Sequence, residues 1–225
     1  MNAREGLAAW LEIDPSALAG VPEPAIDTLA ALVETAMTQY PEMLAALRDR
    51  ADREERSARE LALLALTDHL TGVANRRGLE LHLADELVRA RRYDRPISVI
   101  SIDLDRLKQV NDELGHPAGD EVIRVAAQCL SRHVRASDFV GRLGGDEFVI
   151  VCPETDAADA AGLMAKLRTV LAENPLRLGA TEVGVSCSMG SATAGQEDTL
   201  ATLLEAADAA LYSFKRGVRA RPKTS

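Results

Sequence analysis

The first forty residues carry apolar side chains at the spacing of an interrupted α-helix. Leu7, Trp10 and Leu11 share one helical face, and Asp14-Pro15 is typical of a helix cap followed by a first-turn proline. The stretch GVPEP at residues 20–24 predicts a break. Beyond it, a second apolar face has spacings of three and four residues: Ile26, Leu29, Val33, Met37 and Tyr40. We therefore expect residues 1–40 to form a broken helical segment.

Residues 41–66 predict one long helix with a charged middle and an apolar end. The middle reads DRADREERSARE and the end reads LALLAL. Such a helix either connects and dimerises two copies, carrying a signal to the next domain, or lies solvated against that domain. Residues 1–66 show no haem, flavin or response-regulator pattern, so the sequence does not define the input that this segment receives.

From residue 67 onward, helical and strand patterns alternate. Helices are expected at residues 76–92, 111–134, 157–172 and 199–215, the second of them interrupted at Gly115-His116-Pro117. Strands are expected at residues 97–105, in a hairpin at 139–152, at 176–178 and at 183–194. Antiparallel hairpins mixed with helices predict an α+β domain over residues 67–225, a sheet layered with helices.

The hairpin has an unusual tip, Gly144-Gly145-Asp146-Glu147. Two adjacent carboxylates repel each other and lose hydration in a cleft, and a divalent cation removes that penalty. The two glycines let a phosphate chain lie close to the backbone. The tip therefore predicts half of a metal–nucleotide site, and the alternative is an ordinary solvated turn.

The other half of this site is expected on the strand ISVISIDLD, residues 97–105. The strand is strongly apolar, as at the centre of a covered sheet, but Asp103 interrupts it. A buried, unpaired aspartate is costly, so Asp103 needs a partner. Beside the hairpin tip it would bring three carboxylates together, the hard oxygen ligands that suit Mg²⁺ or Mn²⁺ bound with substrate phosphates.

Composition narrows the function classes. The chain has 225 residues, 47% of them hydrophobic, and a net charge of −9, which argues against a nucleic-acid surface. Cys129, Cys152 and Cys187 are odd in number and lack CxxC spacing, so we expect buried thiols in a reducing compartment. No apolar run approaches the roughly 18 residues of a membrane span, and no secretory signal is visible. We expect a cytoplasmic protein without a membrane or nucleic-acid partner.

Four motifs, in order, resemble the GGDEF-domain diguanylate cyclases. They are DHLTGVANRR at residues 68–77, IDLDRLKQVNDELGHPAGDE at 102–121, RASDFVGRLGGDEF at 135–148 and AADAALYSFKRGVR at 206–219. The resemblance covers roughly the last two-thirds of the chain. It implies a palm-like, ferredoxin-type sheet with the GGDEF hairpin at its edge.

The resemblance also implies the reaction: two GTP molecules joined head to tail into cyclic di-GMP, with release of two pyrophosphates. Two Mg²⁺ or Mn²⁺ ions per active site are implied. Their ligands would be the carboxylates of Asp103, Asp146 and Glu147 and the carbonyl of Leu104. The same three carboxylates are the implied catalytic residues, and the division of base and metal roles between Asp146 and Glu147 stays open.

Other positions match the residues with which the family binds its substrate. Asn111 and Asp120 stand where the family recognises guanine, and a carboxylate and an amide suit the donors of that base. Asn111 could also be a helix N-cap. The implied phosphate-binding residues are Lys108, Gly144, Gly145, Lys215 and Arg219. The chain departs from the family at Val218, where a glycine is usual.

The motif Arg135-Ala136-Ser137-Asp138 is separated from Gly144 by five residues and matches the family's inhibitory product site. Arginine can grip a phosphate or a guanine edge, and aspartate can accept from guanine N–H groups. A second basic contact is expected from Lys166 or Arg168. The alternative is an exposed ion pair between residues three positions apart.

We therefore expect a diguanylate cyclase that works as a homodimer, with GTP as substrate and cyclic di-GMP as allosteric ligand. One rival is a non-catalytic receptor for GTP or cyclic di-GMP that signals through its N-terminal helices. A polymerase-like nucleotidyl transferase would use the same metal-binding carboxylates. The acidic chain, however, offers no surface that would bind a nucleic-acid template.

Overall fold

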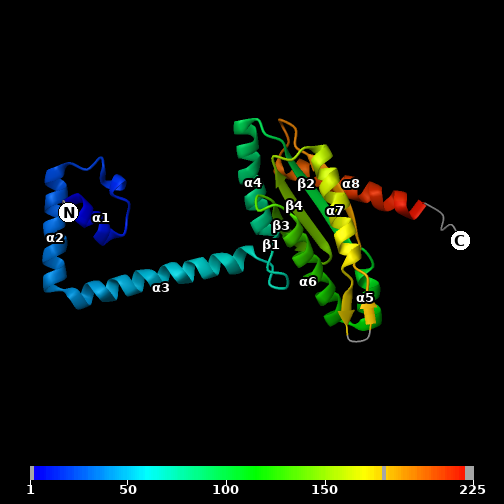
Figure 1. Cartoon of the computed structure of the whole chain (residues 1–225), viewed down its shortest axis with the longest axis horizontal. Helices are drawn as coiled ribbons and strands as arrows, with labels where there is room; N and C mark the ends of the chain where they lie inside the picture. Colours follow the sequence, from blue (N-terminus) through cyan, green and yellow to red (C-terminus); the bar gives the residue numbers. More distant parts are fainter. Residues whose placement is uncertain (1–2, 179–180, 221–225) are drawn as a thin grey trace. The chain divides into compact units, whose positions relative to one another are not determined.

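The computed structural model describes residues 3–178 and 181–220, except for the side chains of residues 59–60, 62–64, 178 and 218–220. The described chain divides into two compact units, with the boundary between Leu61 and Ala62. The first elements are α1 (Ala3–Leu11), the 3-10 helix η1 (Pro15–Leu18), α2 (Glu23–Gln39) and α3 (Pro41–Leu66). The broken helical pattern predicted for this region is confirmed (Figure 1).

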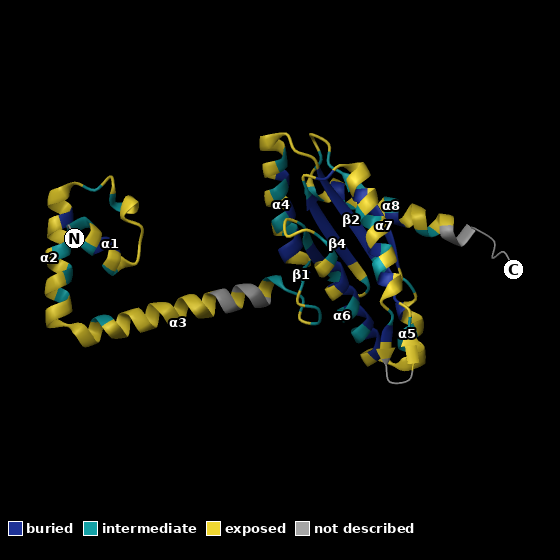
Figure 2. Ribbon diagram, viewed as in Figure 1, coloured by how far each residue is buried: buried dark blue, intermediate teal, exposed yellow. Residues whose placement is uncertain are grey.

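The N-terminal unit has a small core where α1 packs on α2. Leu7, Ala8 and Ile26 are its buried apolar residues, and the Asp14 carboxylate caps η1 by accepting from the Ser16 backbone N–H, as predicted. Most of the remaining surface of α2 and α3 is exposed (Figure 2). Among the described side chains, the large exposed apolar ones of α2, α3 and the Tyr40 cap between them are Leu29, Leu32, Met37, Tyr40, Met43, Leu47 and Leu61.

The second unit is a mixed sheet layered with helices. Its helices are α4 (Arg76–Tyr93), α5 (Leu107–Leu114), α6 (His116–His133), α7 (Ala157–Glu173) and α8 (Leu200–Ala220). Its strands are β1 (Ala74–Asn75), β2 (Ile97–Leu104), β3 (Phe139–Gly144), β4 (Glu147–Pro153), β5 (Leu176–Leu178), β6 (Thr181–Val183) and β7 (Cys187–Thr193). The main sheet has the order β1-β3-β4-β2-β7, and β5 and β6 form a separate ribbon. The predicted α+β, palm-like architecture is confirmed.

Three local expectations were wrong. The hairpin of β3 and β4 is not at the sheet edge, because β1 pairs in parallel with β3 and leaves β4 in the centre. The strand expected at residues 183–194 starts only at Cys187, as β7 paired with β2, whereas Val183 ends β6, which pairs with β5. Asn111 is not a helix N-cap: Arg106, at a left-handed φ of 61°, starts α5 four residues earlier than the pattern indicated.

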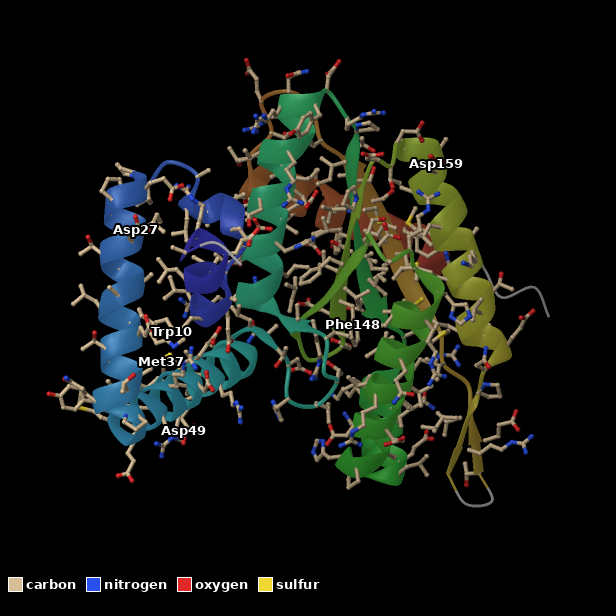
Figure 3. The ribbon with its side chains drawn as sticks, turned by 60° about the vertical axis from the view of Figure 1, so that its left-hand side comes forward. Trp10, Asp27, Met37, Asp49, Phe148 and Asp159 are labelled. Carbon is tan, nitrogen blue, oxygen red and sulfur yellow. The ribbon has the colours of Figure 1, made fainter. Side chains whose placement is uncertain are left out.

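Helices cover both faces of the main sheet (Figure 1). On one face, α4 and α8 pack on alternate residues of β2 and β4, including Val99 and Val149. On the other, α6 and α7 cover the intervening residues, including Ile100 and the fully buried Phe148 (labelled in Figure 3). Because successive strand residues point to opposite faces, Asp103 shares the face of Val99, toward α4 and α8.

The three cysteines are buried and free, as expected. Burial raises the pKa of the Cys152 and Cys187 thiols to about 12, so both are neutral and unreactive at physiological pH. Among the described residues, no helix is long and apolar enough to cross a membrane.

Candidate active site

The GGDEF loop (residues 144–148) lies beside the end of β2. In the antiparallel register, Asp103 stands opposite Glu147, and the Leu104 N–H donates to the Asp146 carbonyl at 3.1 Å. Gly144 and Gly145 have φ values of 147° and 52°, a backbone that other residues rarely adopt. The predicted pairing of the Asp103 strand with the carboxylate-bearing hairpin is confirmed.

Arg142 holds the loop in this position. Its Nε and Nη2 donate to the Gly145 carbonyl at 3.0 and 2.7 Å, while Nη1 donates to both carboxylate oxygens of Asp68 at 3.0 and 3.2 Å. Asp68 also accepts from the backbone N–H and hydroxyl of Thr71. One guanidinium therefore joins the loop to the segment that follows α3.

Sequence reasoning missed Arg142. The available signal was a charged residue within an otherwise apolar strand, three positions after Phe139 begins β3. Burial raises the pKa of Asp68, but the hydrogen bonds from Thr71 and Arg142 outweigh it and leave that pKa below its ordinary value. Asp68 is therefore ionised at neutral pH, as its pairing with the arginine requires.

Asp103 is paired with Lys215 of α8. Lys215 Nζ lies 2.5 Å from Asp103 Oδ2, and the two side chains are 29% and 18% exposed. The backbone of α8 can approach the sheet because β7 carries Gly190, where an added Cβ would lie 2.0 Å from the Leu211 nitrogen. The predicted phosphate-binding lysine and the predicted metal ligand thus meet directly.

The electrostatics around Asp103 favour an additional cation. Burial raises the pKa of Asp103, the nearby carboxylates of Asp146 and Asp105 raise it further, and Lys215 opposes the shift without cancelling it. Where side chains are described, no three acidic, histidine or cysteine side chains are grouped closely enough to hold a metal ion. The donor chemistry nevertheless fits Mg²⁺ or Mn²⁺, because Asp103 and Glu147 stand opposite each other and carry the hard carboxylate oxygens that these ions bind together with substrate phosphates.

Asn111 and Asp120 come from the two helices α5 and α6. The Asn111 Oδ1 atom is buried and has no hydrogen-bond partner among the described residues. It lies against Gly119, where an added Cβ would approach it to 1.9 Å. A buried acceptor without a partner is costly, so this oxygen is suited to a donor supplied by a ligand. Asp120 is partly buried, and Lys108 is exposed on the first turn of α5.

The Arg135–Asp138 motif forms a turn rather than a side-chain ion pair. Asp138 Oδ2 accepts from the Arg135 backbone N–H at 2.8 Å, and among the described residues the Asp138 carboxylate forms no ion pair with the Arg135 guanidinium. Both residues line a cavity of about 220 Å³ together with Lys166 and with Asp159, which is labelled near the start of α7 in Figure 3. Lys166 Nζ donates to the His133 carbonyl at 2.8 Å at this cavity.

The two candidates for the second basic contact are separated by the structure. Lys166 lies at the motif, whereas the Arg168 guanidinium sits over the Phe214 ring at 5.0 Å, against α8. Arg168 therefore does not join the Arg135 cluster. The side chain of Arg219 lies outside the described residues, as does that of Val218.

Comparison with known proteins gives a consistent picture. The family described as diguanylate cyclase, GGDEF domain, matches residues 65–221. The response regulator PleD of Caulobacter vibrioides is 41% identical over 159 residues, covering 69% of this chain and 35% of PleD. The diguanylate cyclase DgcP of Pseudomonas aeruginosa is 36% identical over 157 residues, covering 70% of this chain and 23% of DgcP. The chain thus aligns with only about a third or less of these relatives.

Two solved structures are similar in fold. The coiled coil and GGDEF domain of DgcB from Caulobacter crescentus, in complex with c-di-GMP, matches with a TM-score of 0.73 and 29% identity, covering 78% of this chain and 93% of that one. The diguanylate cyclase SiaD of Pseudomonas aeruginosa, in complex with its activator SiaC, has a TM-score of 0.66 and 28% identity. That match covers 96% of this chain and 97% of the SiaD chain, so it includes the N-terminal helices.

Proposed function

The chain belongs to the GGDEF-domain diguanylate cyclase family, and we propose that it condenses two GTP molecules into cyclic di-GMP, releasing two pyrophosphates. The observation that carries the proposal is the pairing of Asp103 with Glu147 at the glycine-rich hairpin tip. This arrangement puts carboxylates where a triphosphate can approach the backbone, which a purely structural hairpin does not need.

The protein's task in this reaction is to position the nucleotide and neutralise charge. Asp103, Asp146, Glu147 and the Leu104 carbonyl would hold two Mg²⁺ or Mn²⁺ ions, which supply the lowered pKa of the attacking 3′-hydroxyl and the compensation of triphosphate charge. Asp146 lies on the loop itself, where its carboxylate can also accept the proton of that hydroxyl.

Guanine recognition falls to Asn111 and Asp120. The unpartnered Asn111 oxygen accepts an N–H of the base, and the Asp120 carboxylate accepts from the others. Adenine presents an acceptor at the corresponding ring position and lacks the amine, so it would leave these oxygens unpaired. Gly119 leaves the room that the Asn111 amide occupies, because an added Cβ would lie 1.9 Å from its Oδ1.

The triphosphate is bound by the GGDEF glycines and by basic side chains. Gly144 and Gly145 allow close approach of the phosphates, and Lys108, Lys215 and Arg219 supply positive charge. Lys215 already lies at the end of β2 beside the loop, through its ion pair with Asp103, which stands opposite Glu147.

Two domains are needed, because each domain binds one GTP and the reaction joins two. A homodimer with its two loops facing each other across a two-fold axis satisfies this requirement. The helix α3 is suited to hold the copies together, since Leu47 and Leu61 are 55% and 63% exposed on it. DgcB, whose solved chain includes a coiled coil, supports this role for the helix.

We also propose feedback by cyclic di-GMP at the Arg135–Asp138 turn. The Arg135 guanidinium is not engaged by Asp138, and Lys166 adds a second cation at the same cavity. The DgcB structure holds c-di-GMP, which supports product binding by this class of domain.

The rival function is a non-catalytic receptor, and one experiment separates the two. Purified protein is incubated with GTP and Mg²⁺, and the products are separated by chromatography. Formation of cyclic di-GMP and pyrophosphate supports the cyclase. Binding of GTP without turnover, under conditions where a known cyclase is active, would favour the receptor.

The N-terminal helices are suited to receive a protein signal. SiaD, which matches nearly the whole chain, was solved with an activator protein. In this chain the exposed apolar residues of α2, including Leu32 and Met37, provide a surface of the appropriate kind.

A further inference from the structure

Lys215 has one ammonium group and two possible partners, the Asp103 carboxylate and the phosphates of the substrate. Its Nζ forms an ion pair with Asp103 at 2.5 Å, although Asp103 is the carboxylate assigned to the metal. The proposed function assigns the same ammonium to the substrate triphosphate. Lys215 cannot pair closely with both Asp103 and a phosphate while a divalent cation also occupies Asp103.

The charges near Asp103 explain why the lysine is held there. Asp146 and Asp105 are both close enough to raise the pKa of Asp103. The Asp105 carboxylate accepts a hydrogen bond from the Ser188 hydroxyl at 2.8 Å. Among the described residues, Asp103 forms one salt bridge, with Lys215. The lysine therefore provides the local cation that the carboxylates require before any ligand arrives.

We propose that the Lys215 ammonium blocks Asp103 in the nucleotide-free protein. A divalent cation then binds tightly only together with a nucleotide whose phosphate oxygens form an ion pair with Lys215 in place of Asp103. The proposal rests on the metal site of the proposed cyclase. It assigns Lys215 as a switch that couples the binding of metal and triphosphate, beyond its role as a phosphate contact.

The physical basis is an exchange of partners. A lysine has a flexible four-carbon stem and a compact charge, and the Lys215 side chain is partly exposed, so its ammonium can turn without moving α8. A divalent cation replaces it at Asp103 with more charge, but alone it would leave the ammonium beside another cation. Phosphate oxygens remove that repulsion. By linkage, metal and nucleotide must raise each other's affinity by the same factor.

The test measures Mn²⁺ binding directly, from the free-ion signal in electron paramagnetic resonance, without turnover. The full chain is titrated alone and with 3′-deoxy-GTP, which lacks the attacking hydroxyl. Lys215→Met is compared with Arg216→Met, which removes the same charge from the neighbouring position but lies over Tyr212 rather than at Asp103. Lys215→Gln is measured alongside, and thermal unfolding identifies any variant that does not fold.

We expect Lys215→Met and Lys215→Gln to bind Mn²⁺ alone at least about fivefold more tightly than the parent, the lower end of typical coupling between two sites. The tightening by 3′-deoxy-GTP should shrink in the same variants, and Arg216→Met should behave as the parent. Adding Asp103→Asn to Lys215→Met should abolish the gain.

Equal Mn²⁺ affinity in the parent and the folded Lys215 variants would overturn the switch. A gain that survives Asp103→Asn would overturn it too, because the cation would then bind elsewhere. Failure of the cyclase proposal is seen separately, as the absence of cyclic di-GMP from GTP and Mg²⁺ with the parent protein.

Discussion

Asp68 and Arg142 lie 74 positions apart in the chain, and their ion pair at 3.0 Å fixes the backbone of the GGDEF loop. The same guanidinium donates twice to the Gly145 carbonyl. Asp68 therefore orients the Arg142 side chain, and Arg142 in turn holds the loop. Both side chains are largely enclosed, at 16% and 10% exposed. The pair therefore fixes the loop that carries Asp146 and Glu147, the proposed metal ligands.

Replacing Arg142 should lower turnover more than it lowers nucleotide affinity. In Arg142→Ala the Gly145 carbonyl and the Asp68 carboxylate lose their donor, which costs about 1–3 kcal/mol of stability. The loop carboxylates lose their fixed position, so we expect kcat to fall at least about tenfold with a smaller change in KM. Steady-state pyrophosphate release and chemical denaturation measure the two effects.

The control for this variant is Arg124→Ala, which breaks an exposed pair with Glu121 on α6. An exposed ion pair contributes little, so the control should remain within about 0.5 kcal/mol of the parent. If both variants retain the parent's kcat, Arg142 does not position the loop.

Asp68 should also shape the acid stability of the protein. Its pKa is lowered in the folded state, so its contribution to stability is present above the ordinary aspartate pKa and is lost as the pH falls through the lowered folded value. We expect the melting temperature of Asp68→Asn to be lower than that of the parent at pH 6. The two values should converge below pH about 4, where the parent loses the carboxylate contribution. A constant difference between pH 6 and pH 3 would contradict this assignment.

The local patterns predicted the central pairing of the site, because an apolar strand interrupted by Asp103 and a hairpin tipped by Asp146 and Glu147 are each visible within a few residues. The pairing of Asp103 with Lys215 could not be predicted in this way. It depends on how closely α8 approaches β7, which the missing side chain of Gly190 permits.

The same limit explains the errors in the fold. The two-residue strand β1 is too short to leave a period-2 pattern. The sequence therefore does not predict that β1 pairs with β3 and covers the outer edge of the hairpin. Alternation at residues 183–194 indicated strand but not the partner, and β6 and β7 belong to different sheets. The early start of α5 follows from the left-handed backbone of Arg106, a residue that gives no such signal in the sequence.

The metal assignment predicts that Asp103→Asn and Glu147→Gln each abolish product formation while the protein stays folded. Removing one electrostatic stabiliser of the transition state costs roughly 3 kcal/mol, or at least about a hundredfold in kcat. Product is measured by chromatography after incubation with GTP and Mg²⁺, and folding by circular dichroism. Turnover near the parent level in either folded variant would exclude that carboxylate as a ligand.

The guanine site can be tested by adding one methyl group. In Gly119→Ala the new Cβ would lie 1.9 Å from Asn111 Oδ1, so the amide must leave its position. We expect the KM for GTP to rise at least about tenfold, since a displaced acceptor no longer meets the base. Gly162→Ala on α7 is the matched control, because apart from its chain neighbours and its own helix backbone no atom lies within 4 Å of its added Cβ. Equal KM values in the two variants would place the base elsewhere.

Product inhibition separates the roles of the two basic residues on α7. Lys166 lies with Arg135 and Asp138 at one cavity, whereas Arg168 is stacked on Phe214. We therefore expect Arg135→Ala and Lys166→Ala to weaken cyclic di-GMP binding, measured by calorimetry, and to relieve inhibition by added product while leaving the initial rate intact. Arg168→Ala should be inhibited as strongly as the parent, because its guanidinium does not reach the turn. Unchanged inhibition in Arg135→Ala would rule out the turn as the product site, and relief in Arg168→Ala alone would move the site toward α8.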